Sequence, residues 1–168
     1  MFGELVQRHQ DPVFGMALRF VGGRADAEDI AQEAFLRAYK GLDAFKGEAM
    51  FSTWLYRITF NLCADWLRRN RRAGRRAVAV EEAAEIADGR VNLEHGMLES
   101  ERRDEIRNAI DGLDERYRNV IVLLYYQRLS YEQIAAVLGV PVKTVETRLY
   151  RARKLIRKSL GGEEGGAA

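Results

Sequence analysis

Residues 129–148 read LSYEQIAAVLGVPVKTVETR, and this stretch has the layout of two short helices that meet at a tight turn. Ser130 and Gln133 form an S-x-x-Q capping box, which starts the first helix. Gly139 permits the turn, and Pro141 begins the second helix, where no amide donor is needed. We expect Val145 to face the core, together with Leu149 just beyond this stretch. The pattern predicts a helix-turn-helix.

The second of these helices leaves a polar and basic side open. Between residues 143 and 158 the sequence holds seven Lys or Arg residues and one acid, Glu146. A helix of this width fits the major groove of DNA, and its positive charge attracts phosphates. A solvated helical face with a basic bias is the alternative interpretation. The predicted contact residues are Lys143, Thr144, Glu146, Thr147, Arg148, Tyr150, Arg151 and Arg153.

A second informative stretch covers residues 51–72, FSTWLYRITFNLCADWLRRNRR. Its aromatic residues, Trp54, Tyr56, Phe60 and Trp66, point in several directions around a helix, so we expect some of them to be exposed or to line a groove. Bases of unpaired nucleotides stack on such rings, while Arg side chains hold phosphates. The alternative is that these rings belong to the core of a helix buried from several sides.

The rest of the chain favours helices throughout. Its 168 residues are 47% hydrophobic with only two prolines, and no stretch alternates like a strand. The patterns predict a short first helix, a second one starting at Asp11-Pro12, a third capped by Asp26, a long one from Thr53 to about Arg72, and another capped by Asp114. We predict an all-α protein with helical domains at 1–72 and 97–160, a flexible linker at 73–96 and a disordered tail at 161–168.

Composition argues against several classes of protein. The net charge is only +2, and one cysteine, Cys63, forms no internal disulfide, which suits a reducing cytosol. His9 and His95 are isolated and no Gly-rich phosphate loop is present, so we predict no catalytic residue, no metal site and no cofactor. No long apolar run or signal peptide is found, so a cytoplasmic protein without membrane insertion is expected.

Taken together, the motifs resemble those of the extracytoplasmic-function (ECF) sigma factors of bacterial RNA polymerase. The resemblance covers nearly all of residues 2–160, and its marks are residues 26–39 (DAEDIAQEAFLRAY), residues 51–58 (FSTWLYRI) with Asn61 and Asp65, and residues 148–153 (RLYRAR). The family implies two helical modules. Region 2 docks on the clamp helices of core polymerase and opens the −10 element, and region 4 binds the −35 element.

The resemblance also implies roles for individual residues. The polymerase-binding residues would be Asp29, Gln32, Glu33, Leu36 and Arg37. The residues that recognise and melt the −10 element would be Phe45, Lys46, Phe51, Trp54, Tyr56, Arg57, Asn61, Arg68 and Arg69. The residues named above on the second helix of the helix-turn-helix would read the −35 element, where Glu146 departs from a position that is often basic or small in relatives. An anti-sigma factor is the further partner that the family implies.

The sequence thus predicts a sigma factor that binds core polymerase and promoter DNA without catalytic chemistry of its own. About 25 flexible residues average roughly 27 Å end to end, and one turn of duplex advances about 34 Å, so the two modules can reach separate DNA sites. The alternative is a helix-turn-helix transcription regulator that is not a polymerase subunit and uses residues 1–72 to dimerise or sense a ligand. An RNA-binding adaptor that uses the arginine run is a third possibility.

Overall fold

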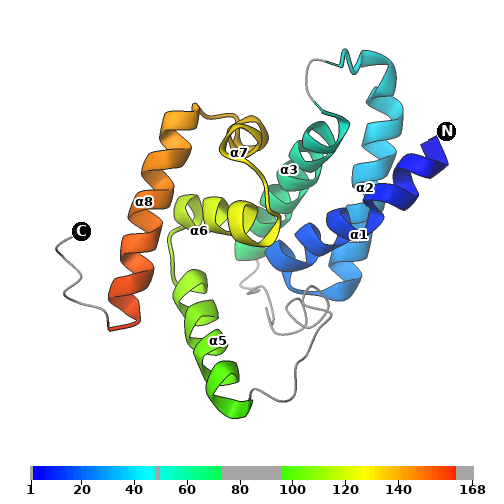
Figure 1. Ribbon diagram of the computed structural model, residues 1–168. Helices are drawn as coiled ribbons and strands as arrows, with labels where there is room; N and C mark the ends of the chain where they lie inside the picture. The colour runs from blue at the N-terminus through cyan, green and yellow to red at the C-terminus, as the bar shows by residue number, and fades with distance from the viewer. Residues whose placement is uncertain (1, 48–49, 73–95, 162–168) are drawn as a thin grey trace. The chain divides into compact units, whose positions relative to one another are not determined.

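The computed structural model describes residues 2–47, 50–72 and 96–161, and its helices fall into two units (Figure 1). The first unit contains α1 (Phe2–Val21), α2 (Arg24–Gly41), the short 3₁₀ turn η1 (Leu42–Ala44) and α3 (Phe51–Arg72). The second contains α5 (Gly96–Asp111), α6 (Glu115–Ile121), the π-helical segment η3 (Val122–Tyr126), most of α7 (Tyr131–Leu138), and α8 (Val142–Ser159).

The predicted break at Asp11-Pro12 is wrong, because α1 runs through Pro12 without interruption. A proline inside a helix removes a backbone hydrogen bond and costs about 3 kcal/mol. The apolar side chains on both sides of it nevertheless keep one helical phase, from Leu5 through Val13 and Met16 to Phe20, and the last three are buried. Burial of this continuous stripe against α2 and α3 offsets the cost of the proline.

Two other predicted helix starts are also displaced. Helix α2 begins at Arg24 with Gly23 as its N-cap in extended backbone, so Asp26 lies in the first turn instead of capping the helix. Its carboxylate is still favourable there, because the N-terminus of a helix carries partial positive charge. Helix α3 begins at Phe51 rather than Thr53, and the Trp54 amide donates to the Met50 carbonyl oxygen at 3.1 Å.

The core of the first unit lies where α1, α2 and α3 pack on one another. Three alanines of α2, at positions 27, 34 and 38, are fully buried, and their small size lets neighbouring helices approach closely. Leu55 of α3 is fully buried, and the buried Thr59 hydroxyl donates to the Leu55 carbonyl oxygen at 2.9 Å. Cys63 is buried, and burial raises the pKa of its thiol to about 12.

The second unit is built around α6 and α8, which pack on each other. Asp114 caps α6 as predicted, since its carboxylate accepts from the Glu115 amide at 3.1 Å. After α6 the backbone widens into η3, and Arg128 then adopts φ 57°, the only positive φ of a non-glycine residue among the residues that the structure describes. This junction leads the chain into α7.

The helix-turn-helix is confirmed in its capping details. The Gln133 amide donates to the Ser130 hydroxyl at 3.1 Å and the Ser130 amide donates to Gln133 Oε1 at 2.8 Å, which is the reciprocal capping box at the start of α7. Gly139 ends α7 with φ 71°, a left-handed conformation that favours glycine. Helix α8 begins at Val142 with Pro141 as its N-cap, so it starts one residue after the predicted position.

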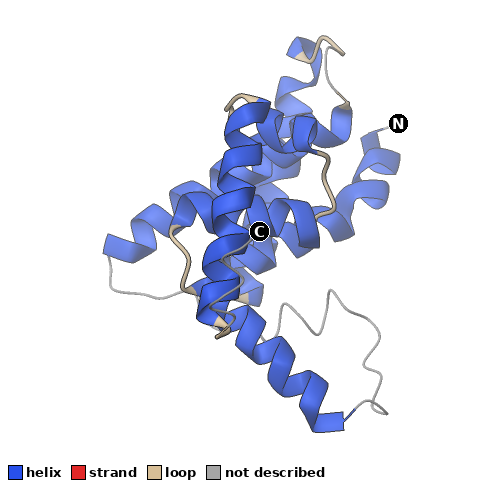
Figure 2. Ribbon diagram, turned by 60° about the vertical axis from the view of Figure 1, so that its left-hand side comes forward, coloured by secondary structure: helices blue, strands red, loops and turns tan. Residues whose placement is uncertain are grey.

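The secondary structure of residues 2–47, 50–72 and 96–161 consists of helices and their connections (Figure 2), so the all-α prediction is confirmed. Across these residues, no helix combines the length and apolar character needed to cross a membrane. The predicted linker lies outside the described residues except for Gly96, with which α5 begins. The predicted disordered tail also lies outside them except for Gly161.

Candidate nucleic-acid and polymerase interfaces

Helix α8 separates an apolar face from a polar one. Val145, Leu149 and Ala152 are fully buried, which anchors the helix to its own unit. The opposite side presents most of the predicted −35 contacts to solvent, with Thr144 and Arg148 half-exposed and Lys143, Glu146, Thr147, Tyr150 and Arg151 exposed. Because its apolar face is fixed in the core, α8 can present its outer face to a partner without rearrangement.

Five of these predicted residues lie around one hollow of about 210 Å³: Lys143, Thr144, Thr147, Arg148 and Arg151. The structure adds two residues to it that the sequence analysis did not select, Arg116 and Tyr117 of α6. They lie more than 20 residues before α8, the recognition helix of the helix-turn-helix, so no spacing rule along one helix connects them with it. Only the packing of α6 on α8 brings the two sets together.

Arg153 lies in different surroundings from the rest of the predicted set. Its Nε donates to the Tyr125 hydroxyl at 2.8 Å, and its guanidinium carbon lies 5.7 Å from the centre of the Tyr125 ring. Hydrogen bonds with Tyr131 and Tyr125 raise the pKa of Arg153. The side chain therefore joins α8 to η3 and to the first residue of α7, and it does not line the 210 Å³ hollow.

In the first unit, the predicted −10 aromatics largely contact one another. Phe45 stacks on Trp54 with ring centres 4.8 Å apart, and the Phe51 ring lies 5.9 Å from Phe45 and 5.7 Å from Trp54. The three half-buried rings, which we call the aromatic cluster, join the start of α3 to the residue after η1. His9 packs on Phe51 at 5.6 Å, and its pKa is lowered by burial and then by Arg8.

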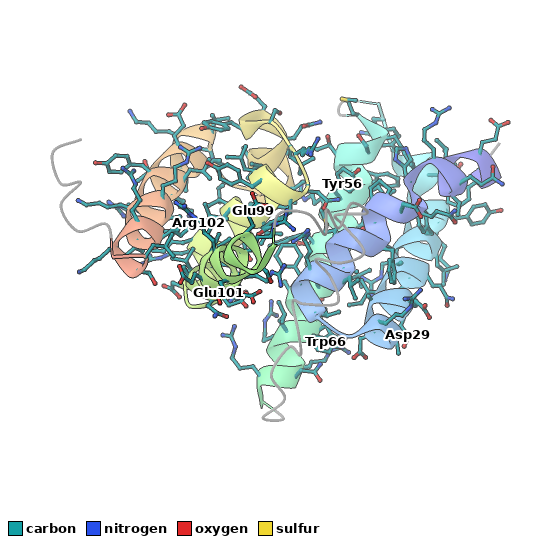
Figure 3. The ribbon with its side chains drawn as sticks, turned by 60° about the horizontal axis from the view of Figure 1, so that its bottom comes forward. Asp29, Tyr56, Trp66, Glu99, Glu101 and Arg102 are labelled. Atoms are coloured by element: carbon teal, nitrogen blue, oxygen red, sulfur yellow. The ribbon has the colours of Figure 1, made fainter. Side chains whose placement is uncertain are left out.

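Helix α3 carries three further aromatic residues, and two of them, Tyr56 and Trp66, are labelled in Figure 3. Tyr56 is only 9% exposed and belongs to the core, so little of its ring is available to a base. Trp66 is half-buried in the second half of the helix. Phe60 makes an edge-to-face contact with Phe20 of α1 at 5.5 Å. Of the four rings expected to be exposed or to line a groove, none is exposed: Tyr56 is buried, and Trp54, Phe60 and Trp66 are half-buried.

The polar residues predicted for the −10 element are open to solvent. Arg57 and Asn61 are exposed on α3 four residues apart, so they share one face of the helix, and Lys46 is exposed after η1. Arg68 and Arg69 line a hollow of about 390 Å³ together with Leu62, Asp65 and Arg37 of α2. Arg37, predicted to bind polymerase, thus lies beside two arginines predicted to bind the −10 element.

The residues predicted to bind core polymerase lie along one side of α2. Asp29, Gln32 and Leu36 are exposed at spacings of three and four, and Asp29 can be followed on its helix in Figure 3. Leu36 is 46% exposed. Glu33 is tied to Arg37 by an ion pair of 3.0 Å. This side offers carboxylates around an apolar residue.

Comparisons with known proteins agree for both units. The family model for sigma-70 region 2 matches residues 5–73, and that for sigma-70 region 4 matches residues 103–156. The chain is 38% identical to the ECF RNA polymerase sigma factor SigW of Bacillus subtilis (strain 168), over 95% of this chain and 88% of that protein. It is 39% identical to the ECF RNA polymerase sigma-E factor of Escherichia coli (strain K12), over 92% and 84% of the two chains.

Solved structures support the same fold. The structure of CnrH in complex with the cytosolic domain of CnrY matches with a TM-score of 0.70 and 32% identity, covering 97% of this chain and 89% of that one. The sigma factor RpoE, solved with the anti-sigma factor NepR from Bartonella quintana, matches with a TM-score of 0.69 and 21% identity, covering 97% and 98% of the chains, and shows the fold alone. The chain belongs to the sigma-70 family of RNA polymerase sigma factors, in its ECF group.

Proposed function

We propose that this sigma factor binds core RNA polymerase and directs it to promoters by holding DNA at two places. The observation that carries the proposal is that one chain contains both modules, a region 2 unit and a region 4 unit, each with an open basic face. A helix-turn-helix regulator that is not a polymerase subunit has no need of a region 2 module. Family membership therefore favours the sigma function over that alternative.

In the second unit, α8 enters the major groove of the −35 element. Its exposed face offers Arg148 and Arg151 to base edges or phosphates, and Thr144 and Thr147 to either. Glu146 accepts hydrogen bonds only, so it suits a cytosine amino group and disfavours a nearby phosphate. This distribution gives α8 both attraction to duplex DNA and a basis for choosing a sequence.

In the first unit, α3 and the end of η1 bind the parted strand of the −10 element. The half-buried rings of the aromatic cluster leave part of their surface to a stacked base, and the exposed Asn61 supplies an amide that can pair with a base edge. Lys46, Arg57, Arg68 and Arg69 supply positive charge for its phosphates. A base held in this way offsets part of the cost of unpairing, which is a few kcal/mol.

The partners follow from the surfaces and the family. The exposed side of α2, with Asp29, Gln32 and Leu36, is proposed to meet the clamp helices of core polymerase. An anti-sigma factor is proposed as a regulatory partner, and the similar protein CnrH was solved with the cytosolic domain of CnrY. We propose that the chain works in the cytoplasm and performs no catalysis itself, since the polymerase supplies the chemistry.

Run-off transcription with core polymerase and a promoter library tests the proposal. The purified chain should direct specific transcripts whose start sites share one −35 and one −10 sequence. Core polymerase alone should give none. A chain that leaves the polymerase inactive on every template, and that instead binds palindromic duplexes as a polymerase-free dimer, would establish the regulator alternative.

A further inference from the structure

The hollow between α6 and α8 adds one cation from α6 to the three that α8 supplies there. Four cations line it: Lys143, Arg148 and Arg151 from α8 and Arg116 from α6. The remaining lining residues are Thr144, Thr147 and Tyr117, so its walls contain hydroxyl groups and no carboxylate. We propose that this hollow binds a phosphodiester group of the duplex backbone, with Arg116 as a contact supplied from outside the helix-turn-helix.

Two contacts orient the exposed Arg116 side chain in the free protein. Its guanidinium carbon lies 4.8 Å from the centre of the Tyr117 ring, and its Nε lies 3.4 Å from Asp114 Oδ2. Asp114 is itself fixed, because its other carboxylate oxygen accepts from the Glu115 amide. A guanidinium has five N–H donors, so one carboxylate contact leaves others for a phosphate. The pair with Asp114 removes part of the charge and restricts where the guanidinium points.

A phosphate is the ligand that suits this arrangement, because α6 flanks the recognition helix. Contacts from flanking elements go mainly to the backbone, and they set the register of the helix in the groove without reading sequence. The hollow volume of about 210 Å³ is open to solvent on the same side as the exposed Lys143 and Arg151. This inference rests on the proposed binding of duplex DNA by α8 and adds to it a positioning contact.

Arg116→Ala in the full chain gives the first test, with Arg102→Ala as the matched control. Arg102 is an exposed arginine of α5 (Figure 3) that does not line the hollow, so it removes the same formal charge elsewhere in the unit. The Arg116 variant should bind a −35 duplex and a scrambled duplex about fivefold more weakly each. Its loss of affinity between 50 and 200 mM salt should be about threefold smaller than that of the wild type. Arg116→Lys should restore most of the salt dependence.

A scan of the same duplex with single methylphosphonate linkages identifies the partner. One neutral linkage should weaken the wild type and the Arg102 variant but have little further effect on Arg116→Ala. If every linkage weakens wild type and Arg116→Ala equally, or if the Arg116 and Arg102 variants bind alike, the inference is overturned. A fall in the thermal stability of Arg116→Ala that accounts for its weaker binding, with no linkage lost, overturns it too. A wild type that binds no promoter duplex would instead reject the proposed function.

Discussion

The two units meet DNA with surfaces of different kinds. In the region 4 unit, a single helix exposes a row of polar side chains, and its apolar face is fixed in the core by Val145 and Leu149. In the region 2 unit, the rings proposed for the parted strand are half-buried or buried, and Phe45, Phe51 and Trp54 contact one another. The surface proposed to read a duplex lies on one helix, α8. The surface proposed to bind an unpaired base depends instead on packing among several elements.

The comparison treats the two units as separately stable, and a cavity made in the core of one unit tests this most strongly. Leu55 and Leu149 are both fully buried, one in each unit, and replacing a buried leucine by alanine costs about 2–5 kcal/mol. Leu149→Ala should abolish −35 duplex binding, while Leu55→Ala should leave it nearly unchanged. The measurement is duplex affinity of the full chain at a temperature where the wild type is folded.

Cys63 provides the reciprocal readout for the first unit. Its thiol is buried with a pKa of about 12, so a thiol reagent labels it only when that unit opens. Leu55→Ala should speed the labelling by roughly 30-fold or more, since 2 kcal/mol corresponds to about that factor. Leu149→Ala should not change it. Equal acceleration by both variants would mean that the units open together.

Within the second unit, Arg148→Ala and Arg153→Ala separate reading DNA from holding the fold. Arg148 lines the hollow beside the proposed groove contacts, so its loss should cost about 1–3 kcal/mol of −35 recognition while polymerase binding stays intact. Arg153 is hydrogen-bonded to Tyr125, so its loss should lower the unfolding free energy by about 1 kcal/mol. Thermal unfolding and binding to matched and mismatched duplexes measure both effects. Unchanged transcript yield from a −35-dependent promoter would contradict the role of Arg148.

Where the sequence predicted the fold well, the signals were short-range. The Ser130–Gln133 capping box and the Asp114 cap depend on neighbours within three residues, and both are present in the structure. The break at Pro12 was predicted from the same kind of signal and is wrong, because packing of the stripe from Leu5 to Phe20 depends on α2 and α3. Local chemistry decides a helix end only where burial does not oppose it.

The DNA-binding surfaces show the same difference between short-range signals and tertiary packing. The outer face of α8 could be predicted from helical periodicity, since its polar side follows from the buried Val145 and Leu149. Periodicity gave no means of placing Arg116 beside that face, or of separating Arg153 from it, because each placement depends on a residue of another element. For α3, the aromatic residues were visible in the sequence, but the stacking of Phe45 on Trp54 is a tertiary feature.

Asn61→Ala tests the strand-binding side of the comparison. The side chain is exposed on α3, so its removal leaves no cavity and the fold should be unaffected. Loss of its paired hydrogen bonds should slow promoter opening by about tenfold, equivalent to about 1.4 kcal/mol. On a template with a premelted bubble the defect should be much smaller. Open-complex formation on both templates measures this, and equal defects on duplex and bubble would reject the role.

Arg128→Gly has the smallest expected effect and concerns the junction between η3 and α7. Arg128 is exposed and has φ 57°, a conformation that costs a residue with a Cβ about 1–2 kcal/mol. Glycine removes that cost but loses more entropy on folding, about 0.5–1 kcal/mol, so the net gain in unfolding free energy should be roughly 0.5–1 kcal/mol. Arg128→Ala keeps the strain and removes the charge, so it should not gain stability. Chemical denaturation of the three proteins separates the two causes. The substitution relieves backbone strain without changing the outer face of α8, so the affinity for a −35 duplex should stay unchanged. A gain in affinity together with stability would show that α8 does not have its binding conformation in the free protein.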